Sequence, residues 1–248
     1  MRLLSLLLAA CALLAGTAHA QADLERERRT AEEVRQNLLV GEALSLQLPS
    51  GRSFFAILTR AAKPRAGVVL VHGIGAHPDW GLINALRTQL PAAGYTTLSI
   101  QMPVLAEDAK PDQYPTVYPD AGARLRAAVA FLRASGLEKV VVISHDVGGN
   151  MVNDYLVRDA QPAVNAWVSI GIAGGAFRDA AKLRLPVLDV FGEKDFAAVL
   201  KGADTRANDI RLLRGSAQVE VAGADHFFDG HAAALAGHVR LWLDRALK

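Results

Sequence analysis

An alternation of short apolar runs with helix-length stretches is the feature that most restricts the fold of this chain. Apolar runs that suit buried strands lie at Gly67–Val71, Thr96–Ile100, Val140–Ile143, Ala166–Ile172, Val187–Phe191 and Ala217–Val221. Continuous apolar runs of this length are typical of parallel strands that are buried on both faces. The segments between them have helical spacing, as in "DAGARLRAAVAFLRASG" and "GHAAALAGHVRLWLDRAL". The sequence therefore predicts an α/β fold, with a mostly parallel central sheet covered by helices on both faces.

The remaining segments complete the predicted domain organisation. We expect a signal peptide at residues 1–20, a charged lead-in at residues 21–40 and one α/β domain at residues 41–248. The run "DLERERRTAEEVR" in the lead-in is interpreted as a solvated helix or a mobile segment. The domain opens with a hairpin from about Ala43 to Thr59, and the longest irregular connection runs from Gln101 to Pro119.

The first twenty residues have the pattern of an export signal. Arg2 gives a positive start, an apolar stretch follows, and Ala18-His19-Ala20 places small residues at the cleavage position. We therefore expect a periplasmic mature chain without stable membrane insertion. Cleavage at Cys11, as in a lipoprotein, is the alternative, but it would leave an apolar segment behind the lipid-modified cysteine. With Lys+Arg 27 against Asp+Glu 25, the charge balance gives no reason to expect a nucleic acid partner.

Polar residues follow the predicted strands at the edge where open α/β sheets bind their ligands. The strand that starts at Val140 runs into "SHDVG", which places Asp146 at the tip of a small-x-nucleophile-x-small turn. Asp195 in "GEKD" and His226 in "ADHFF" follow the last two predicted strands, which gives the order nucleophile, acid, histidine. Ser144 is a poor alternative nucleophile, because it lies two residues before the tip and should point into the sheet. The candidate catalytic residues are therefore Asp146, Asp195 and His226.

This order of motifs resembles the α/β-hydrolase fold over nearly the whole mature chain. The resemblance implies that "HGIG" is an oxyanion loop, in which the backbone N–H of Ile74 joins that of Val147. His72 in the same loop is a candidate substrate-binding residue. Tyr114 and Tyr118 are further candidates, as leaving-group donors, although packing is their alternative role.

An aspartate at the tip is similar to the nucleophile of haloalkane dehalogenases and epoxide hydrolases. In those enzymes a carboxylate attacks an alkyl carbon, and a histidine-activated water then cleaves the ester. This chain departs from both families, because Val147 replaces their usual tryptophan and the interval between Asp146 and Asp195 is too short for a cap domain. The motifs "HPDW", "LSIQMP" and "GADHFF" together resemble an exported, uncharacterised family of α/β-hydrolase-like proteins from proteobacteria.

Two classes of function remain open at this stage. The first is a lidless hydrolase that acts on a small ester-like or alkyl electrophile through Asp146, His226 and Asp195. The second is a non-catalytic binding or envelope-assembly protein on a hydrolase scaffold. No cofactor and no metal is expected, because "GIG" lacks the third glycine of a dinucleotide site and the histidines have no cysteine or paired carboxylate beside them. The expected partner is a small-molecule substrate, and the sequence does not indicate an oligomeric state.

Overall fold

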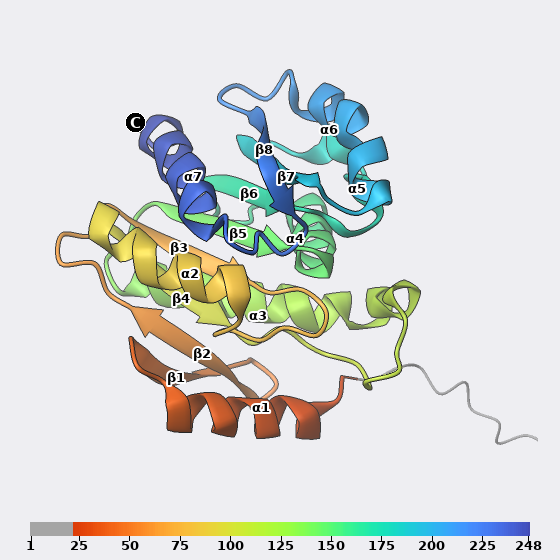
Figure 1. The fold of residues 1–248 in the computed structure, drawn as a ribbon. Coiled ribbons are helices and arrows are strands. Elements are labelled where there is room, and N and C mark those ends of the chain that lie inside the picture. Colours follow the sequence, from red (N-terminus) through yellow and green to blue (C-terminus); the bar gives the residue numbers. More distant parts are fainter. Residues whose placement is uncertain (1–21) are drawn as a thin grey trace, which may run out of the picture.

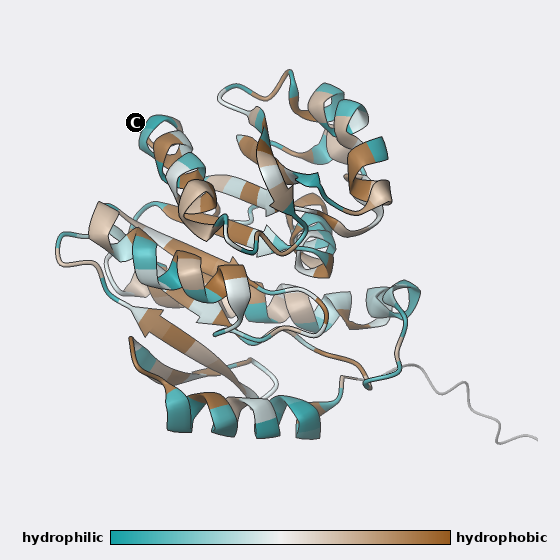
Figure 2. Ribbon diagram, in the orientation of Figure 1, coloured by the Kyte–Doolittle hydropathy of each residue, from teal (hydrophilic) through white to brown (hydrophobic). Residues whose placement is uncertain are grey.

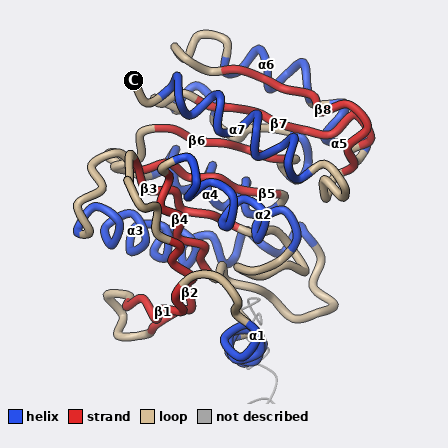
Figure 3. The backbone as a smooth tube through the Cα atoms, turned by 60° about the vertical axis from the view of Figure 1, so that its left-hand side comes forward, coloured by secondary structure: helices blue, strands red, loops and turns tan. Residues whose placement is uncertain are grey.

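The computed structural model describes residues 22–248, which form a single eight-stranded sheet with helices on both faces (Figure 1). The predicted signal peptide lies outside the described residues. The strands are β1 (Glu42–Gln47), β2 (Ser53–Thr59), β3 (Ala66–Val71), β4 (Tyr95–Ile100), β5 (Val140–His145), β6 (Ala166–Ile170), β7 (Val187–Lys194) and β8 (Ala217–Asp225). Their order is β1-β2-β4-β3-β5-β6-β7-β8, and β1 and β8 lie at opposite ends of the sheet (Figure 3). The β1–β2 and β2–β4 pairs are antiparallel and the others are parallel, which confirms the predicted fold class.

The helices divide the core into two layers. They are α1 (Leu24–Asn37), α2 (Gly81–Gln89), α3 (Tyr118–Ala134), α4 (Val147–Arg158), α5 (Ala197–Lys201), α6 (Ala203–Ile210) and α7 (Ala232–Ala246). One apolar cluster joins α3 and α4 to the sheet, and another joins α2 and α7 to its opposite face. The central strands are mainly apolar, whereas the helices alternate polar and apolar residues (Figure 2). Among residues 22–248, no helix combines the length and apolar character needed to cross a bilayer.

Several predicted boundaries differ from the structure. β6 ends at Ile170 instead of residue 172, because Gly171 has a positive φ of 50° that leaves the strand conformation. β7 and β8 continue past their apolar runs, since their last residues, Lys194 and Asp225, still pair across a register shift. The connection after β4 is only partly irregular, because it contains the short 3-10 helix η2 (Pro111–Val117) and leads directly into α3.

Helix α1 packs on the domain. This differs from the expectation for the charged lead-in, which was a solvated helix or a mobile segment. Val34 on its inner face contacts Phe55 and Ile57 of β2 in a small apolar cluster. Glu27 is 7% exposed, and its carboxylate pairs with Arg124 of α3 at 2.7 Å. If this segment were a solvated coil, the Arg124 guanidinium would lose that partner. Helix α1 is therefore part of the folded domain.

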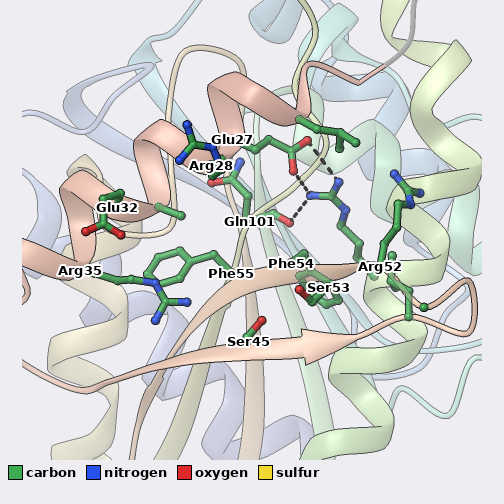
Figure 4. Close-up of a pocket in the computed structure, with 15 residues that line it drawn as sticks. Glu27, Arg28, Glu32, Arg35, Ser45, Arg52, Ser53, Phe54, Phe55 and Gln101 are labelled. Atoms are coloured by element: carbon green, nitrogen blue, oxygen red, sulfur yellow. Dashed lines mark hydrogen bonds and ion pairs between the residues drawn. The ribbon is translucent and has the colours of Figure 1, made fainter.

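A cavity of about 520 Å³ lies between α1 and the β1–β2 hairpin (Figure 4). The buried ion pair of Glu27 and Arg124 is part of its wall, and the rings of Phe54 and Phe55 line it from β2. None of the three candidate catalytic residues lines this cavity. The cavity is therefore formed where α1 packs on the hairpin, and it is separate from the candidate catalytic residues.

Candidate active site

Asp146 lies on a strained turn between β5 and α4. Its φ of 54° and ψ of −128° are unusual for a residue that carries a side chain. The turn also needs small neighbours, because a Cβ on Gly148 would lie 2.4 Å from the backbone oxygen of His72. Ser144 is fully buried, and its Oγ accepts a hydrogen bond of 2.9 Å from the indole of Trp167. The tip therefore presents Asp146, and Ser144 points into the sheet as predicted.

The structure brings Asp195 and His226 together at the carboxyl edge of the sheet. Because Lys194 pairs with Asp225, the next residue on each chain segment lies beside the other. Asp195 Oδ1 is 2.6 Å from His226 Nδ1, and the backbone N–H of Phe196 also donates to this carboxylate at 2.7 Å. Burial opposes ionisation of Asp195, but the hydrogen bond and charge of His226 hold its pKa below the ordinary value. Asp195 is thus a carboxylate that orients His226.

The two oxygens of the Asp146 carboxylate have different surroundings. Its Oδ2 accepts a hydrogen bond of 3.0 Å from the backbone N–H of Ile74, in the predicted oxyanion loop. Its Oδ1 faces His226, with 3.8 Å between Oδ1 and Nε2. The second predicted donor, Val147, opens α4 but makes no hydrogen bond to this carboxylate within residues 22–248. The oxyanion loop therefore holds an oxygen of the protein's own side chain.

His72 is placed differently from a substrate-binding residue. Its ring is 2% exposed; Nδ1 donates to the carbonyl of Gly73 at 2.9 Å, and Nε2 accepts from the N–H of Met102 at 3.0 Å. These bonds use both ring nitrogens and tie the oxyanion loop to the segment after β4. We correct the prediction accordingly, since His72 positions the loop and its ring has no nitrogen left for a ligand.

The two tyrosines differ in their access to the site. Both tyrosines are buried in the same apolar cluster, at 8% exposed for Tyr118 and 3% for Tyr114, but Tyr118 also lines a cavity next to Val147. Burial raises the pKa of both hydroxyls, and the charge of Asp146 adds to this effect. Both hydroxyls are therefore protonated and lie within electrostatic reach of Asp146, but only Tyr118 is on a cavity wall.

His145 is a functional neighbour that the sequence reasoning missed. Its Nε2–H donates to the backbone carbonyl of His226 at 3.0 Å, and the two rings lie 4.7 Å apart. Burial, and then the neighbouring His226, lower the pKa of His145 to about 4, so its ring is neutral at pH 7. Phe196 stacks on the other side, with its ring centroid 4.1 Å from that of His226. The sequence offered one hint of their role, because each of these residues lies directly beside a motif residue.

Two cavities flank Asp146. One of about 530 Å³ is largely apolar and is lined by residues that include Ile74, Trp80, Leu82, Ile83, His145 and Phe227. The other, of about 400 Å³, is more polar and is lined by residues that include Asp112, Tyr118, Val147, Asn150, Ala173 and Arg178. His145 lines the first cavity and Val147 lines the second, so the residues on either side of Asp146 in the chain line different cavities, although Asp146 itself lines neither.

The buried histidines predict an acid-sensitive fold. Burial lowers the pKa of His72 to about 4, as it does for His145, against an ordinary value of 6.5. Between pH 4 and pH 6.5 these histidines bind protons in the unfolded chain but not in the folded chain. Their contribution to the free energy of unfolding is therefore complete above pH 6.5 and is lost as the pH falls toward 4. Each histidine should lower the free energy of unfolding by about 1.4 kcal/mol per pH unit in this range. Urea unfolding at several pH values measures the slope, which His72→Gln should reduce and His231→Gln, at a partly exposed site, should not. An unchanged slope in His72→Gln would contradict the assignment.

Comparisons with known proteins agree with this architecture. A dienelactone hydrolase from Anabaena variabilis superposes with a TM-score of 0.65 at 20% identity, over 84% of this chain and 98% of that one. A lidless α/β serine hydrolase from Xanthomonas campestris gives a TM-score of 0.66 at 16% identity, over 84% and 95%. A putative α/β hydrolase of unknown function from Agrobacterium tumefaciens gives 0.65 at 19% identity, over 83% and 96%.

The sequence comparisons add a family of undefined activity. No curated protein matches the chain. Residues 3–121, just under half of the chain, match the model of a family described as "Protein of unknown function (DUF3530)". This chain is therefore an α/β-hydrolase-fold protein without a lid, and its N-terminal part is similar to that family.

Proposed function

We propose that the protein is a lidless hydrolase that cleaves a small electrophile through a covalent ester at Asp146. The observation that carries the proposal is the split environment of this carboxylate. One oxygen accepts from Ile74, and the other faces His226, which Asp195 orients. Esterase and hydrolase neighbours of the same fold support a hydrolytic reaction.

In the first step, Asp146 Oδ1 attacks the electrophilic carbon. A C–O bond forms, and the bond to the leaving group breaks with its electron pair. Asp146 has no proton to lose, so this step needs no base. Tyr118, which lines the adjacent cavity, is the candidate proton donor to the leaving group.

In the second step, water attacks the ester carbon of Asp146. His226 Nε2 takes the proton from water, and the resulting imidazolium is stabilised by Asp195. Negative charge then develops on Oδ2, where the N–H of Ile74 already donates. Collapse breaks the bond between Cγ and Oδ1, and the product alcohol takes the proton from His226. The remaining acid loses the second water proton to solvent, or to the phenolate of Tyr118 where Tyr118 protonated the leaving group, and the carboxylate is restored with one oxygen from water.

The same geometry favours an alkyl electrophile over an ordinary ester. A substrate carbonyl would need the oxyanion loop for its own developing charge, but Asp146 Oδ2 occupies the N–H of Ile74. An epoxide or a haloalkane carries no such carbonyl, and a carboxylate suits displacement at saturated carbon. We therefore place epoxides and haloalkanes ahead of esters and lactones.

Isotope incorporation tests the proposal. The purified chain is first assayed against epoxides, haloalkanes, lactones and esters, with Asp146→Ala expected to lose activity on the order of 10⁴-fold. A single turnover in heavy-oxygen water should then place the label in the Asp146 peptide, as mass spectrometry can show. Labelled product with an unlabelled Asp146 peptide, or full activity in Asp146→Ala, would exclude Asp146 as the nucleophile. Inactivity throughout the panel would favour the non-catalytic alternative.

A further inference from the structure

The polar cavity beside Asp146 contains a cationic side chain that no other residue neutralises. Arg178 lines this cavity together with Val147, the residue after the nucleophile. Within residues 22–248, the guanidinium of Arg178 has no ion pair and no side-chain hydrogen bond. Two arginines of the neighbouring cavity are different, since Arg126 and Arg158 both have aspartate partners. Arg178 is an exposed residue, so its guanidinium faces solvent and is open to a ligand that enters the cavity.

The backbone that carries Arg178 is fixed relative to the nucleophile. Asn153, which is 1% exposed on α4, accepts from the N–H of Arg178 at 2.7 Å and donates to its carbonyl at 3.0 Å. One turn earlier on the same helix, Asn150 donates to the carbonyl of Ala173 at 3.2 Å. Because α4 begins directly after Asp146, these bonds connect the loop of Arg178 to the nucleophile turn.

The charges of Arg178 and Asp146 both affect the pKa of the Tyr118 hydroxyl. Burial is the main cause of the raised pKa of Tyr118; the positive charge of Arg178 lowers this pKa, while the negative charges of Asp154 and Asp146 raise it. The guanidinium and the nucleophile are therefore both within electrostatic reach of one hydroxyl. Asp112 lines the same cavity but does not pair with Arg178 in the structure.

We propose that the substrate carries an anionic group, which Arg178 binds in the cavity beside Val147 while an apolar group occupies the aromatic cavity on the other side of Asp146. This inference rests on the proposed function and deepens it. An anionic substrate would be repelled by the Asp146 carboxylate, and Arg178 supplies the compensating positive charge. The substrate class is therefore a small amphiphilic electrophile, with the reacting carbon between an apolar end and a carboxylate or similar anion.

A pair of unreactive probes tests the proposal without turnover. Binding of 4-phenylbutanoate and of 4-phenylbutan-1-ol, which share the aromatic ring and chain length, is measured by calorimetry on the full chain. The carboxylate should bind about tenfold more tightly than the alcohol, because a charged hydrogen bond to Arg178 replaces a neutral contact. Arg178→Gln should abolish this preference without changing alcohol binding, and Arg178→Lys should keep part of it.

The controls separate this inference from the proposed reaction. Arg158→Gln removes the same charge from an arginine already paired with Asp154, and it should leave the preference unchanged. Asp146→Ala should bind the carboxylate more tightly than the unchanged protein, because it removes the repelling charge. Equal affinity for both probes, no saturable binding of the carboxylate, or an intact preference in Arg178→Gln would overturn the inference. An unlabelled Asp146 peptide, by contrast, would overturn the reaction and leave these binding results standing.

Discussion

Replacement of His226 by glutamine is expected to trap an ester on Asp146. Glutamine cannot take the proton from water, whereas attack by Asp146 requires no base. Turnover should therefore fall by about 10³- to 10⁴-fold while the first step continues. Intact-protein mass spectrometry after incubation with substrate should show one added alkyl group, and digestion should place it on the Asp146 peptide.

A matched histidine serves as the control for this experiment. His231 lies a few residues further along the chain but is partly exposed, and within residues 22–248 the only hydrogen bond of its ring is to the backbone carbonyl of Asp229. His231→Gln should turn over normally and show no adduct. An inactive His226→Gln protein that forms no adduct would contradict the two-step mechanism, provided that its folded circular-dichroism spectrum is retained.

Replacement of Arg124 by methionine is expected to cause the largest loss of stability. Arg124 is 2% exposed and joins Glu27 of α1, Asp120 of α3 and the carbonyl of Gln101. Removing the guanidinium leaves Glu27 buried without a cation, and burial already raises the pKa of this carboxyl. We expect the free energy of unfolding to fall by about 3–5 kcal/mol, as measured by urea denaturation at pH 7.

Two further variants show whether burial is the cause. The double variant Glu27→Gln with Arg124→Met should recover much of the loss, because the uncompensated charge is removed together with its partner. Arg28→Met breaks an exposed pair with Glu25 on the same helix, and it should cost less than about 1 kcal/mol. If Arg124→Met were as mild as Arg28→Met, α1 would not depend on the buried ion pair.

Local patterns were sufficient for the main elements of the fold. The apolar run from Val140 to Ile143 was recognisable as a buried strand because all of its side chains face the core, and the helices on either side keep their spacing over several turns. The burial of Ser144 could be expected because this residue still belongs to β5, a strand that is buried on both faces. Strand ends were harder to place, since Lys194 and Asp225 are polar residues that remain in the sheet only because they pair with each other.

The site was predictable only in outline. The order of Asp146, Asp195 and His226 indicated which residues meet, because the carboxyl ends of parallel strands share one edge of the sheet. His72 was misjudged, because its position in the oxyanion loop does not indicate which way its ring turns. The contact of His145 with His226 depends on a turn that begins after β8, far along the chain from His145.

The sequence by itself determined the strands, the helices and the chain order of the candidate catalytic residues, since each depends on side-chain spacing within a short segment. Only the tertiary structure decided that Glu27 is buried against Arg124, that the N–H of Ile74 binds one oxygen of Asp146, and that the guanidinium of Arg178 lies unpaired in the adjacent cavity. The physical reason is that burial and pairing of a charged group depend on residues that are distant in the chain. A glutamate in a charged helix has the same local pattern whether it faces water or an arginine, and the packing of the complete sheet selects between the two.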